Sequence, residues 1–381
     1  MTAPRDDLDV FYFFRDSSLR RAALRRAPGD AHRYVLFGLD QHIKRGVRAR
    51  HNLDRPMSPP SWARVVDRGL NAAIVRGGGY GGDFAGVLPS LRHANRADVI
   101  FSTVDTVGIP LALLRRSGLV DRPIVYAAIG LPERLARLRP GRARRLYVEA
   151  LGAMETIVAY SRYEVDVLRR ELGRTRTRFA FVPFGVDIAH FRPNPAARLD
   201  VDVVGLGADP HRDFGLLLSL AARRPELRIR VVTTGAVRRA LEPAPSNVEL
   251  ESDISFQSAC DRLATARVVA LPVRPNSYSG ATTVLLQALA LGKPVVISRT
   301  AAIADGYGLE DGGNCRLVEP GNPAAFDDAV IGLLRDEKAA AALGLGARRA
   351  AERLSWDRYA DAMLELLHDT AALKPRRAAA R

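Results

Sequence analysis

A strand–loop–helix segment carries the residues best suited to bind an anion. In LPVRPNSYSGATTVLLQALALGKPVVIS (271–298), an apolar run ends at Val273 and a polar loop leads to a helix predicted to begin at about Gly280, with Ser279 as its N-cap. Free amides at a helix N-terminus hold negative charge. The predicted anion-binding residues are Ser279, Gly280, Ala281, Thr282 and Thr283. The segment could equally well be an ordinary connection between a strand and a helix, without a role in binding.

The first half of the chain contains an unusual glycine-rich stretch, GGGYGG (77–82). Glycines let the backbone approach a ligand closely and offer bare amides to an anion, so Gly78, Gly79 and Tyr80 are candidate acceptor-binding residues. A flexible surface loop is an equal alternative. No strand is predicted directly before the stretch, which argues against a dinucleotide fingerprint.

Polar residues also follow two predicted strands of the first half. STVDTVGIP (102–110) places Thr103 and Asp105 at one strand end, and AIGLPER (128–134) places Glu133 and Arg134 after another. A carboxylate there would orient an acceptor hydroxyl or act as a base, although Asp105 would serve equally well as a helix cap. The basic run 133–145 is either a solvated helical face or a dock for an anionic membrane or lipid acceptor.

These residues must be positioned by alternating strands and helices. Apolar runs rich in Val and Ile, without strict polar alternation, are typical of strands buried on both faces of a parallel sheet. The predicted strands are Leu8–Phe14, Tyr34–Leu39, Asp98–Val104, Pro123–Ile129, Thr156–Tyr160, Phe179–Pro183, Val201–Leu206, Leu227–Thr233, Val268–Val273, Pro294–Ser298 and Cys315–Val318. Amphipathic segments between them include Tyr163–Leu172, Asp213–Arg223 and Ala281–Leu291. The pattern predicts an α/β protein with doubly wound sheets, while the basic, proline-interrupted residues 40–65 are predicted to form a loop or short helices.

The length of 381 residues indicates two domains, and FRPNPAARL (191–199) interrupts the periodicity near the middle. The sequence predicts an N-terminal Rossmann-like domain over 1–190, a second over 191–353, and a final helix and tail over 354–381. Parallel sheets bind ligands at the carboxyl ends of their strands, so a small-molecule site in a cleft between the two domains is expected.

The composition of the chain limits which classes of partner are expected. The net charge of +15 favours anionic ligands, but no nucleic-acid-binding signature is present, and we expect no nucleic acid partner. Two cysteines are too few for a chain of this length to be a disulfide-stabilised secreted scaffold. No apolar run is long enough to span a membrane. The acidic start MTAPRDDLDV does not resemble a signal peptide, so a cytoplasmic protein, peripheral to the inner face of a membrane at most, is expected.

Five segments together resemble the retaining glycosyltransferases of family 4, which have the GT-B fold. The tail ALALGKPVV (288–296) matches the end of that family's signature motif, and VPFGVDIAHFRP (182–193) is similar to its interdomain segment. The other three segments are VVGLGADPHRDF (203–214), GGNCRLVEPGNPAAFDDAV (312–330) and ARRAAERLSWDRYADAMLELL (347–367). The resemblance implies two Rossmann-like domains facing across a cleft, with a C-terminal helix crossing back to the first.

The family's two glutamates, eight positions apart, are replaced here by Ser279 and Gln287. The resemblance implies that Gln287 contacts the nucleotide ribose, that the loop at Gly207 approaches the diphosphate, and that Arg212 grips it, with His211 as a lesser candidate. Lys293 stands in a turn and is expected to be structural. Where the family often carries its N-terminal glycine-rich loop, this chain has RDSS, which makes Asp16 a further acceptor-binding candidate.

The resemblance implies transfer of a sugar from a nucleotide-diphosphate donor to a hydroxyl acceptor (a glycan, lipid or small molecule) with retention of configuration. Helix amides and Arg212 would stabilise the leaving diphosphate, Asp105 and Glu133 would complete the catalytic set, and no metal or cofactor is expected. Loss of both glutamates keeps two alternatives open, namely a relative that binds without turnover and a nucleotide-sugar epimerase of the same fold.

Overall fold

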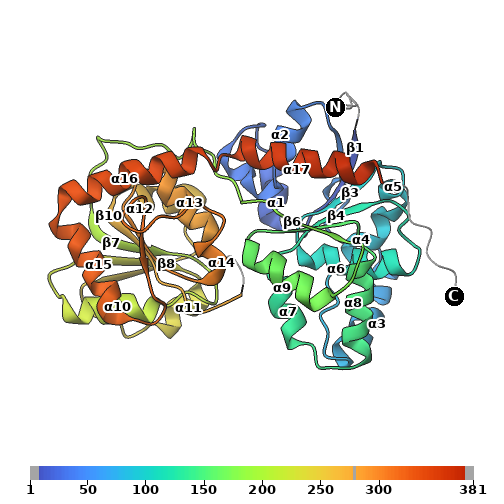
Figure 1. Cartoon of the computed structure of the whole chain (residues 1–381), viewed down its shortest axis with the longest axis horizontal. Helices are drawn as coiled ribbons and strands as arrows, with labels where there is room; N and C mark the ends of the chain where they lie inside the picture. Colours follow the sequence, from blue (N-terminus) through green and yellow to red (C-terminus); the bar gives the residue numbers. More distant parts are fainter. Residues whose placement is uncertain (1–7, 278–279, 374–381) are drawn as a thin grey trace. The chain divides into compact units, whose positions relative to one another are not determined.

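The computed structural model describes residues 8–277 and 280–373 of the chain. The protein divides into two compact units (Figure 1). Unit 1 comprises the residues up to Val182 and those from Tyr359 onward, and unit 2 runs from Pro183 to Arg358. The first break therefore precedes the 191–199 segment at which the sequence placed the boundary, and the second lies within the last helix.

Unit 1 is built on a six-stranded parallel sheet with the order β2-β1-β3-β4-β5-β6. Its strands are β1 (Asp9–Phe13), β2 (Arg48–His51), β3 (Val99–Ser102), β4 (Ile124–Ala127), β5 (Thr156–Ala159) and β6 (Arg178–Phe181). Its helices are α1 (Ser18–Leu24), η1 (Ala31–Leu36), α2 (Leu39–Lys44), η2 (Asn52–Asp54), α3 (Ser61–Arg76), α4 (Phe84–Val87), η3 (Leu88–Ser90), α5 (Leu91–Ala94), α6 (Asp105–Arg116), α7 (Leu131–Arg137), α8 (Arg142–Gly152) and α9 (Arg162–Leu172).

The last helix, α17 (Trp356–Ala371), completes unit 1. Buried polar contacts attach it to the sheet and to α2: Thr156 Oγ1 lies 2.8 Å from Thr370 Oγ1, and His42 Nε2 lies 3.0 Å from the Ala360 carbonyl oxygen. The other ring nitrogen of His42 bonds Tyr12 Oη at 2.6 Å. Burial lowers the pKa of His42 to about 4, so the ring is neutral at physiological pH.

Unit 2 is built on a second six-stranded parallel sheet with the order β12-β11-β10-β7-β8-β9. Its strands are β7 (Val201–Leu206), β8 (Ile229–Thr233), β9 (Val248–Ser252), β10 (Ala266–Leu271), β11 (Val295–Ser298) and β12 (Arg316–Val318). Its helices are α10 (Phe214–Arg223), α11 (Gly235–Ala240), α12 (Phe256–Ala264), α13 (Thr282–Ala290), α14 (Ala301–Ala304), α15 (Pro323–Arg335) and α16 (Glu337–Glu352).

The core of unit 2 has two parts, one on each face of its sheet. Side chains of α12, α13 and α16 pack with one set of strand residues, and side chains of α10 and α15 pack with the other. Along β10 the two sets alternate, since Val269 and Leu271 join the first cluster while Val268 and Ala270 join the second. Helices on both faces of a parallel sheet confirm the predicted doubly wound architecture.

Two edge strands were missed and one predicted strand was wrong. Tyr34–Leu39 is not a strand. Its first residues belong to the 3-10 helix η1 and the rest to the turn that follows and the start of α2, and most of its apolar side chains are buried in this conformation. The true strand of this region, β2, reads RARH and lies inside the segment predicted to be a loop or short helices. The other missed strand, β9, reads VELES. Edge strands are covered less completely by helices, so they lack the continuous apolar run on which the prediction relied.

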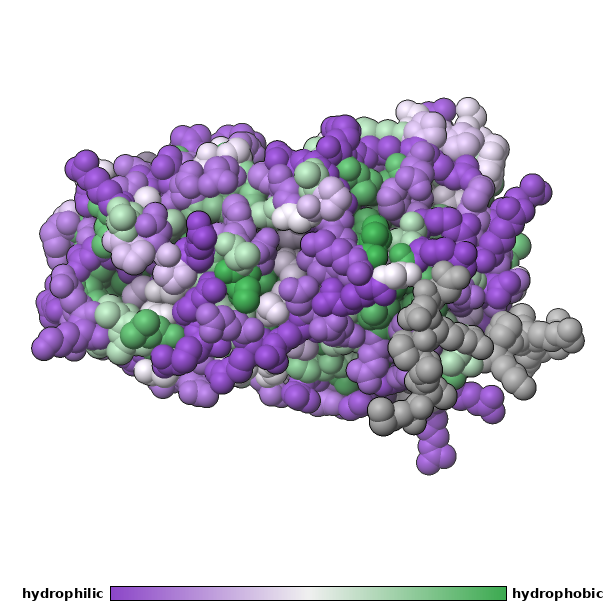
Figure 2. Space-filling view, turned by 90° about the horizontal axis from the view of Figure 1, so that it is seen from above, coloured by the Kyte–Doolittle hydropathy of each residue, from purple (hydrophilic) through white to green (hydrophobic). Residues whose placement is uncertain are grey.

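The face of the molecule drawn in Figure 2 is largely hydrophilic, with apolar residues in separate patches. Within residues 8–277 and 280–373, every helix is too short or too polar to cross a membrane.

Candidate anion-binding site

The strand order of unit 2 creates a switch point at its centre. From β7 the chain runs outward through β8 and β9, and it then returns to the other side of β7 to form β10, β11 and β12. The loops after β7 and β10 therefore leave the sheet in opposite directions and open a crevice at the carboxyl ends of these strands. The two loops are tied together by an antiparallel bridge between Arg212 and Val273, in which the Arg274 amide donates to the His211 carbonyl.

Arg212 lies in this crevice as a buried cation that forms no ion pair among the described residues, although the Asp209 carboxylate acts on it electrostatically. Its exposed fraction is 5%, and neither Nε nor Nη1 has a hydrogen-bond partner among the described residues. Burial lowers the pKa of Arg212 to about 10, which still leaves the guanidinium charged at neutral pH. An unpaired buried charge is costly, so a group of this kind indicates that an anion from outside the chain completes the site.

Gly207 shapes the crevice directly beside the guanidinium. It follows β7 with φ 156°, a backbone conformation that favours glycine. A Cβ atom at this position would overlap the Arg212 guanidinium, lying 2.7 Å from Nη2. The glycine is therefore required for Arg212 to occupy its place, which links the two residues that the sequence predicted for the diphosphate.

Two buried hydroxyls without partners lie at the same edge of the sheet. Thr233 ends β8 and Thr300 follows β11, and the Oγ1 atoms of both lack a hydrogen-bond partner in the described structure. Their neighbour Ser298, at the end of β11, is occupied, because its Oγ accepts from the Val273 amide at 2.9 Å. Of the described residues of unit 2 with such atoms, Arg212, Thr233 and Thr300 lie at the carboxyl edge, where a polar ligand would satisfy them, and Asp200 lies at the amino edge.

Helix α13 begins at this edge, slightly later than predicted. It starts at Thr282, and its N-cap residue is Ala281, which has a left-handed conformation with φ 68° and makes no side-chain capping bond. The predicted N-cap, Ser279, lies outside the described residues. A non-glycine residue in this conformation is strained, a feature that concentrates at functional sites. The N-terminus of a helix carries partial positive charge, so the start of α13 at this edge favours an anion.

The remaining predicted donor-binding residues lie on α13 or directly before it, whereas Lys293, predicted to be structural, lies at the other edge of the sheet. Gly280, Thr282 and Gln287 are buried, the last two on α13, and Thr283 is partly exposed on the first turn of that helix. Lys293 follows Gly292, which has φ 66° and ends the helix, and Lys293 Nζ donates to the Ala266 carbonyl oxygen at 3.0 Å. Ala266 begins β10, so Lys293 lies at the amino edge, as expected of a structural residue.

His211 lies in the loop that carries Arg212, and its amide donates to Asp209 Oδ1 at 2.7 Å. This bond forms a tight turn, after which the chain enters α10 with Asp213 as N-cap. The turn of His211 therefore serves to position Arg212.

The two acids Asp200 and Asp202 lie at the other end of β7. They accept hydrogen bonds from Arg230 and Arg267, respectively, and belong to the sheet edge away from Arg212.

Unit 1 contains a buried network centred on Asp105, the first residue of α6. Its Oδ1 accepts from Tyr126 Oη at 2.6 Å and from the Ile129 amide at 2.9 Å, while Oδ2 accepts from Arg134 Nε at 2.8 Å. Burial raises the pKa of Asp105 against the lowering influence of these donors. The guanidinium of Arg134 lies 4.0 Å from the centre of the Tyr80 ring, a cation–π contact.

This arrangement changes how the predicted residues relate to one another. The carboxylate of Asp105 is 2% exposed and fully engaged, so it positions Arg134 and does not itself offer an oxygen to a ligand. Arg134 and Tyr80, by contrast, retain exposed surface. Glu133 lies on the first turn of α7, 3.9 Å from Arg137 Nη2, and is separate from the network. Thr103 is completely buried and its hydroxyl donates to the Phe13 carbonyl, so it lines no ligand surface.

The glycines of 77–82 serve close packing. A Cβ at Gly79 would lie 2.8 Å from Tyr147 Oη on α8, and one at Gly82 would lie 2.7 Å from Pro110 Cδ on α6. Gly78 has φ 79°, and a Cβ there would meet open space. Tyr147 also donates to the Tyr80 carbonyl oxygen, so the loop is fixed against α8 and holds the Tyr80 ring under Arg134.

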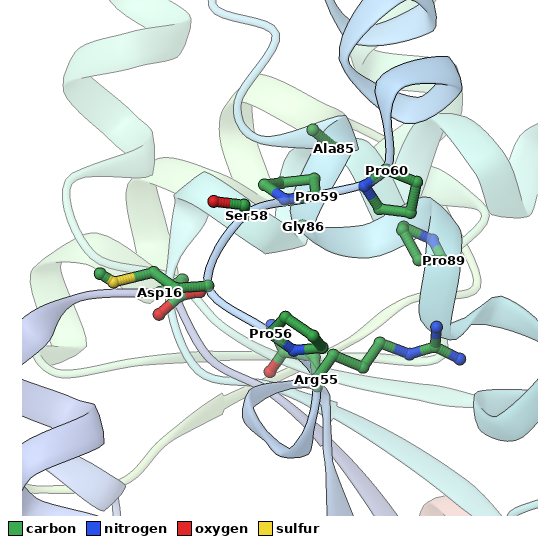
Figure 3. Close-up of a pocket in the computed structure, with 11 residues that line it drawn as sticks. Asp16, Arg55, Pro56, Ser58, Pro59, Pro60, Ala85, Gly86 and Pro89 are labelled. Atoms are coloured by element: carbon green, nitrogen blue, oxygen red, sulfur yellow. The ribbon is translucent and has the colours of Figure 1, made fainter.

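Asp16 lines a pocket of about 160 Å³ at the carboxyl ends of β1 and β2 (Figure 3). Its carboxylate is held by Arg21 through two bonds of 2.8 Å, so the pocket is not strongly acidic. In Figure 3, Asp16 lies on one side of the pocket and the Arg55 guanidinium extends on the other, beneath Pro89. The remaining wall is formed by Asn52, Pro56, Met57, Ser58, Pro59, Pro60, Ala85, Gly86 and Pro89.

Sequence reasoning missed several of these residues. Tyr126 lies in the middle of an apolar run, and only the fold reveals that it faces Asp105. Thr233 and Thr300 could have been found, because each is a hydroxyl residue at the end of a predicted strand. Arg55 belongs to a proline-rich segment whose path cannot be deduced from periodicity.

Residues 214–336 match the sequence family described as Glycosyl transferases group 1. A D-inositol 3-phosphate glycosyltransferase from Xylanimonas cellulosilytica is 28% identical over 262 residues, which cover 60% of this chain and 60% of that protein. A GDP-mannose-dependent alpha-(1-6)-phosphatidylinositol dimannoside mannosyltransferase from Mycobacterium tuberculosis is 29% identical over 264 residues, covering 62% and 65% of the two chains. The alignments thus span less than two thirds of these relatives' lengths.

Solved structures extend the likeness to nearly the whole chain. Sucrose-phosphate synthase from Thermosynechococcus elongatus has a TM-score of 0.71 at 17% identity and covers 95% of this chain and 98% of its own. Anabaena Alr3699/HepE in complex with UDP has a TM-score of 0.62 at 16% identity and covers 95% and 100%. The fold is GT-B. In this fold two Rossmann-like units occur in one chain, and the two parallel sheets described above are those units.

Proposed function

We propose that the protein is a glycosyltransferase that moves a sugar from a nucleoside diphosphate donor to a hydroxyl acceptor. The observation that carries the proposal is Arg212, a buried guanidinium at the switch point of a GT-B unit, whose Nε and Nη1 have no partner in the part of the chain that the structure describes. A diphosphate fits this environment because a guanidinium binds phosphate oxygens through two parallel hydrogen bonds. The names of the similar proteins support the same chemistry.

In this proposal the donor lies along the carboxyl edge of the unit 2 sheet. Arg212 and the first amides of α13 hold the diphosphate, and Gly207 leaves the space for the guanidinium. Gln287 on α13 serves the ribose hydroxyls as donor or acceptor. When the sugar–phosphate bond breaks, negative charge grows on the diphosphate, and fixed amides and a buried cation stabilise it without reorganisation.

We propose that transfer retains the anomeric configuration, as the resemblance to family 4 implies. The leaving diphosphate and the incoming hydroxyl then use the same face of the sugar, and no side-chain nucleophile is required. The replacement of two glutamates by Ser279 and Gln287 removes two negative charges from the donor site. The sugar must therefore be held by neutral donors and acceptors, so its identity is expected to differ from that used by enzymes that keep both acids.

We assign the acceptor to unit 1. The Arg134 guanidinium, supported by Asp105 and stacked on Tyr80, offers a fixed cationic surface, and the pocket beside Asp16 is large enough for a small polar group. Similar proteins are named for D-inositol 3-phosphate and for a phosphatidylinositol dimannoside. An acceptor that carries both hydroxyls and a phosphate therefore matches the charge of Arg134 and is the first class to test.

The proposal includes a cytoplasmic protein in peripheral contact with an anionic membrane. Arginines of the 133–145 segment support it, because Arg137, Arg139, Arg142 and Arg145 are all exposed. Anionic lipid attracts such clusters by about 1 kcal/mol per basic residue near the surface.

The test is nucleotide release in the presence and absence of acceptor. UDP-glucose and GDP-mannose are each incubated with the protein, with and without an inositol phosphate, and released UDP or GDP is separated by chromatography. We expect release that depends on the acceptor and is lost in Arg212→Ala, and product NMR should show the donor's anomeric configuration. Release without acceptor would instead support an epimerase, and tight binding without any release would support a binding protein that does not turn over.

A further inference from the structure

Helix α3 presents an apolar face to solvent. Among the described residues, thirteen large apolar side chains are exposed, and five of them belong to this one helix: Trp62, Val65, Val66, Leu70 and Val75. Trp62 is 54% exposed and Val65 is 66% exposed. Exposed apolar residues are ordinary when scattered, whereas a cluster on one helix indicates a surface that another body covers.

The opposite face of α3 accounts for its attachment to unit 1. Ala63 is buried, and Asp67 turns inward, where its Oδ1 accepts from the Phe84 amide at 2.9 Å and from the Ala85 amide at 3.3 Å. Asn71 donates to the Gly82 carbonyl oxygen at 3.1 Å. The helix is therefore fixed by these polar contacts and by Ala63 and Ile74, which pack against unit 1, while the five exposed apolar residues are left for a partner.

The exposed charged side chains of α3 itself are all basic. Arg64, Arg68 and Arg76 are exposed on α3, while the helix's one acid, Asp67, points away. The C-terminal end of α3 meets α8, since a Cβ at Gly77 would lie 3.1 Å from the Ala143 Cβ. The exposed Arg142 and Arg145, on the same turn of α8 as Ala143, therefore lie near the end of α3, although they are more than sixty positions away in the sequence.

We infer that α3 is the element that inserts into an anionic bilayer, with Trp62 and Val65 entering the interface and the surrounding arginines contacting lipid phosphates. Charge complementarity decides between occupants. A second copy of the chain on this face would set arginine against arginine, which opposes association, whereas an anionic lipid surface satisfies both the apolar and the basic groups. The inference rests on the proposed membrane contact and assigns it to one helix.

The test measures binding to vesicles of phosphatidylcholine with and without phosphatidylglycerol by co-sedimentation. We expect binding only to the anionic vesicles, weakening as salt rises. The double variant Trp62→Ser/Val65→Ser should lower the apparent affinity at least tenfold, and Arg68→Gln/Arg76→Gln should lower both the affinity and its dependence on salt. The matched control is Leu345→Ser, which removes an exposed apolar side chain from α16 and should change nothing.

Fluorescence gives an independent readout from the same helix. The chain has two tryptophans, and Trp356 is buried, so Trp356→Phe leaves Trp62 as the reporter. Its emission should shift to shorter wavelength on addition of anionic vesicles and stay unchanged with neutral ones. The sedimentation assay uses Trp356-containing protein and does not depend on this variant folding.

Each outcome separates the two proposals. Vesicle binding that survives Trp62→Ser/Val65→Ser would overturn the role of α3 and leave the basic membrane contact in place. No binding to anionic vesicles would overturn both, while nucleotide release would remain an unaffected test of the transferase proposal. A dimer in sedimentation velocity that the double variant abolishes would also overturn the inference, since a second copy would then cover the face.

Discussion

In unit 1, the buried carboxylate of Asp105 has three donors within 2.9 Å, whereas in unit 2 the buried guanidinium of Arg212 has two nitrogen atoms without a partner among the described residues. Both groups lie near the carboxyl ends of parallel strands. Unit 1 thus fixes its charges internally and presents a prearranged surface, while unit 2 keeps a charge open for a ligand. We expect mutations in unit 1 to appear mainly as lost stability and mutations at Arg212 mainly as lost binding.

The largest effect is expected for Arg134→Met, which leaves Asp105 buried without its cation. Removing one partner of a buried ion pair should lower the free energy of unfolding by about 3 kcal/mol. Urea denaturation measures the loss. Arg137→Met, on the same helix and exposed, is the matched control and should cost less than about 0.5 kcal/mol. Equal losses in the two variants would show that Asp105 does not depend on Arg134.

The pH dependence of stability gives a second test of whether buried polar groups of unit 1 have their partners within the unit. The folded pKa of His42 is lowered to about 4 from its usual 6.5, so the unfolded chain takes up the proton first. The stabilising contribution is present above pH 6.5 and is lost as pH falls toward 4, by about 3 kcal/mol in all.

His42→Gln should remove this part of the pH dependence, as followed by denaturant unfolding at several pH values between 7 and 4. The exposed His190→Gln is the control and should retain the wild-type slope. If the His42 variant and the wild type lost stability in parallel, His42 would not be held neutral by burial.

In unit 2, Arg212→Ala should weaken diphosphate affinity by about 1–3 kcal/mol, because it removes a charge-assisted hydrogen-bond donor. Isothermal titration calorimetry measures this directly. Arg212→Lys should recover only part of the affinity, since an ammonium lacks the planar fork that binds two oxygens. Stability should change little or rise, because an unpaired buried charge is removed. Unchanged affinity in both variants would take Arg212 out of the site.

The smallest effect is expected for Lys293→Met. Burial lowers the pKa of Lys293, and its ammonium donates to the Ala266 carbonyl at the amino edge of the sheet, away from Arg212. Diphosphate affinity should stay within a factor of two of wild type, or about 0.4 kcal/mol by the conversion of affinity to free energy. A loss of diphosphate affinity as large as that of Arg212→Ala would indicate that the anion binds at the amino edge of the sheet and would contradict the assignment to Arg212.

The sequence predicted the central strands well because parallel strands covered on both faces must be continuously apolar. β7 was predicted residue for residue, and β5 and β11 to within one residue at an end. The edge strands β6 and β12 were also predicted, but β2 was missed because it is rich in arginine and histidine, and a buried 3-10 helix nearby has a more strand-like composition.

The candidate site was only partly accessible from sequence. The position of Arg212 and the helix after β10 followed from the resemblance and from helix-terminus chemistry. The burial of Arg212 beside Gly207 depends on tertiary packing, which no spacing rule reports. Asp105 is a second example. From the sequence it could be a helix cap or a carboxylate that acts on the acceptor, and neither alternative predicted its hydrogen bonds to Tyr126 and Arg134.

The most direct measurement of the central claim is a thermal-shift experiment with UDP, GDP, TDP and ADP, each with and without EDTA. A diphosphate at a hundred times its dissociation constant should stabilise the protein by about 2.7 kcal/mol. We expect at least one diphosphate to raise the melting temperature, EDTA not to reduce the shift, and Arg212→Ala to abolish it. A melting temperature unmoved by all four, or a shift of equal size in Arg212→Ala, would contradict the claim that Arg212 awaits a diphosphate.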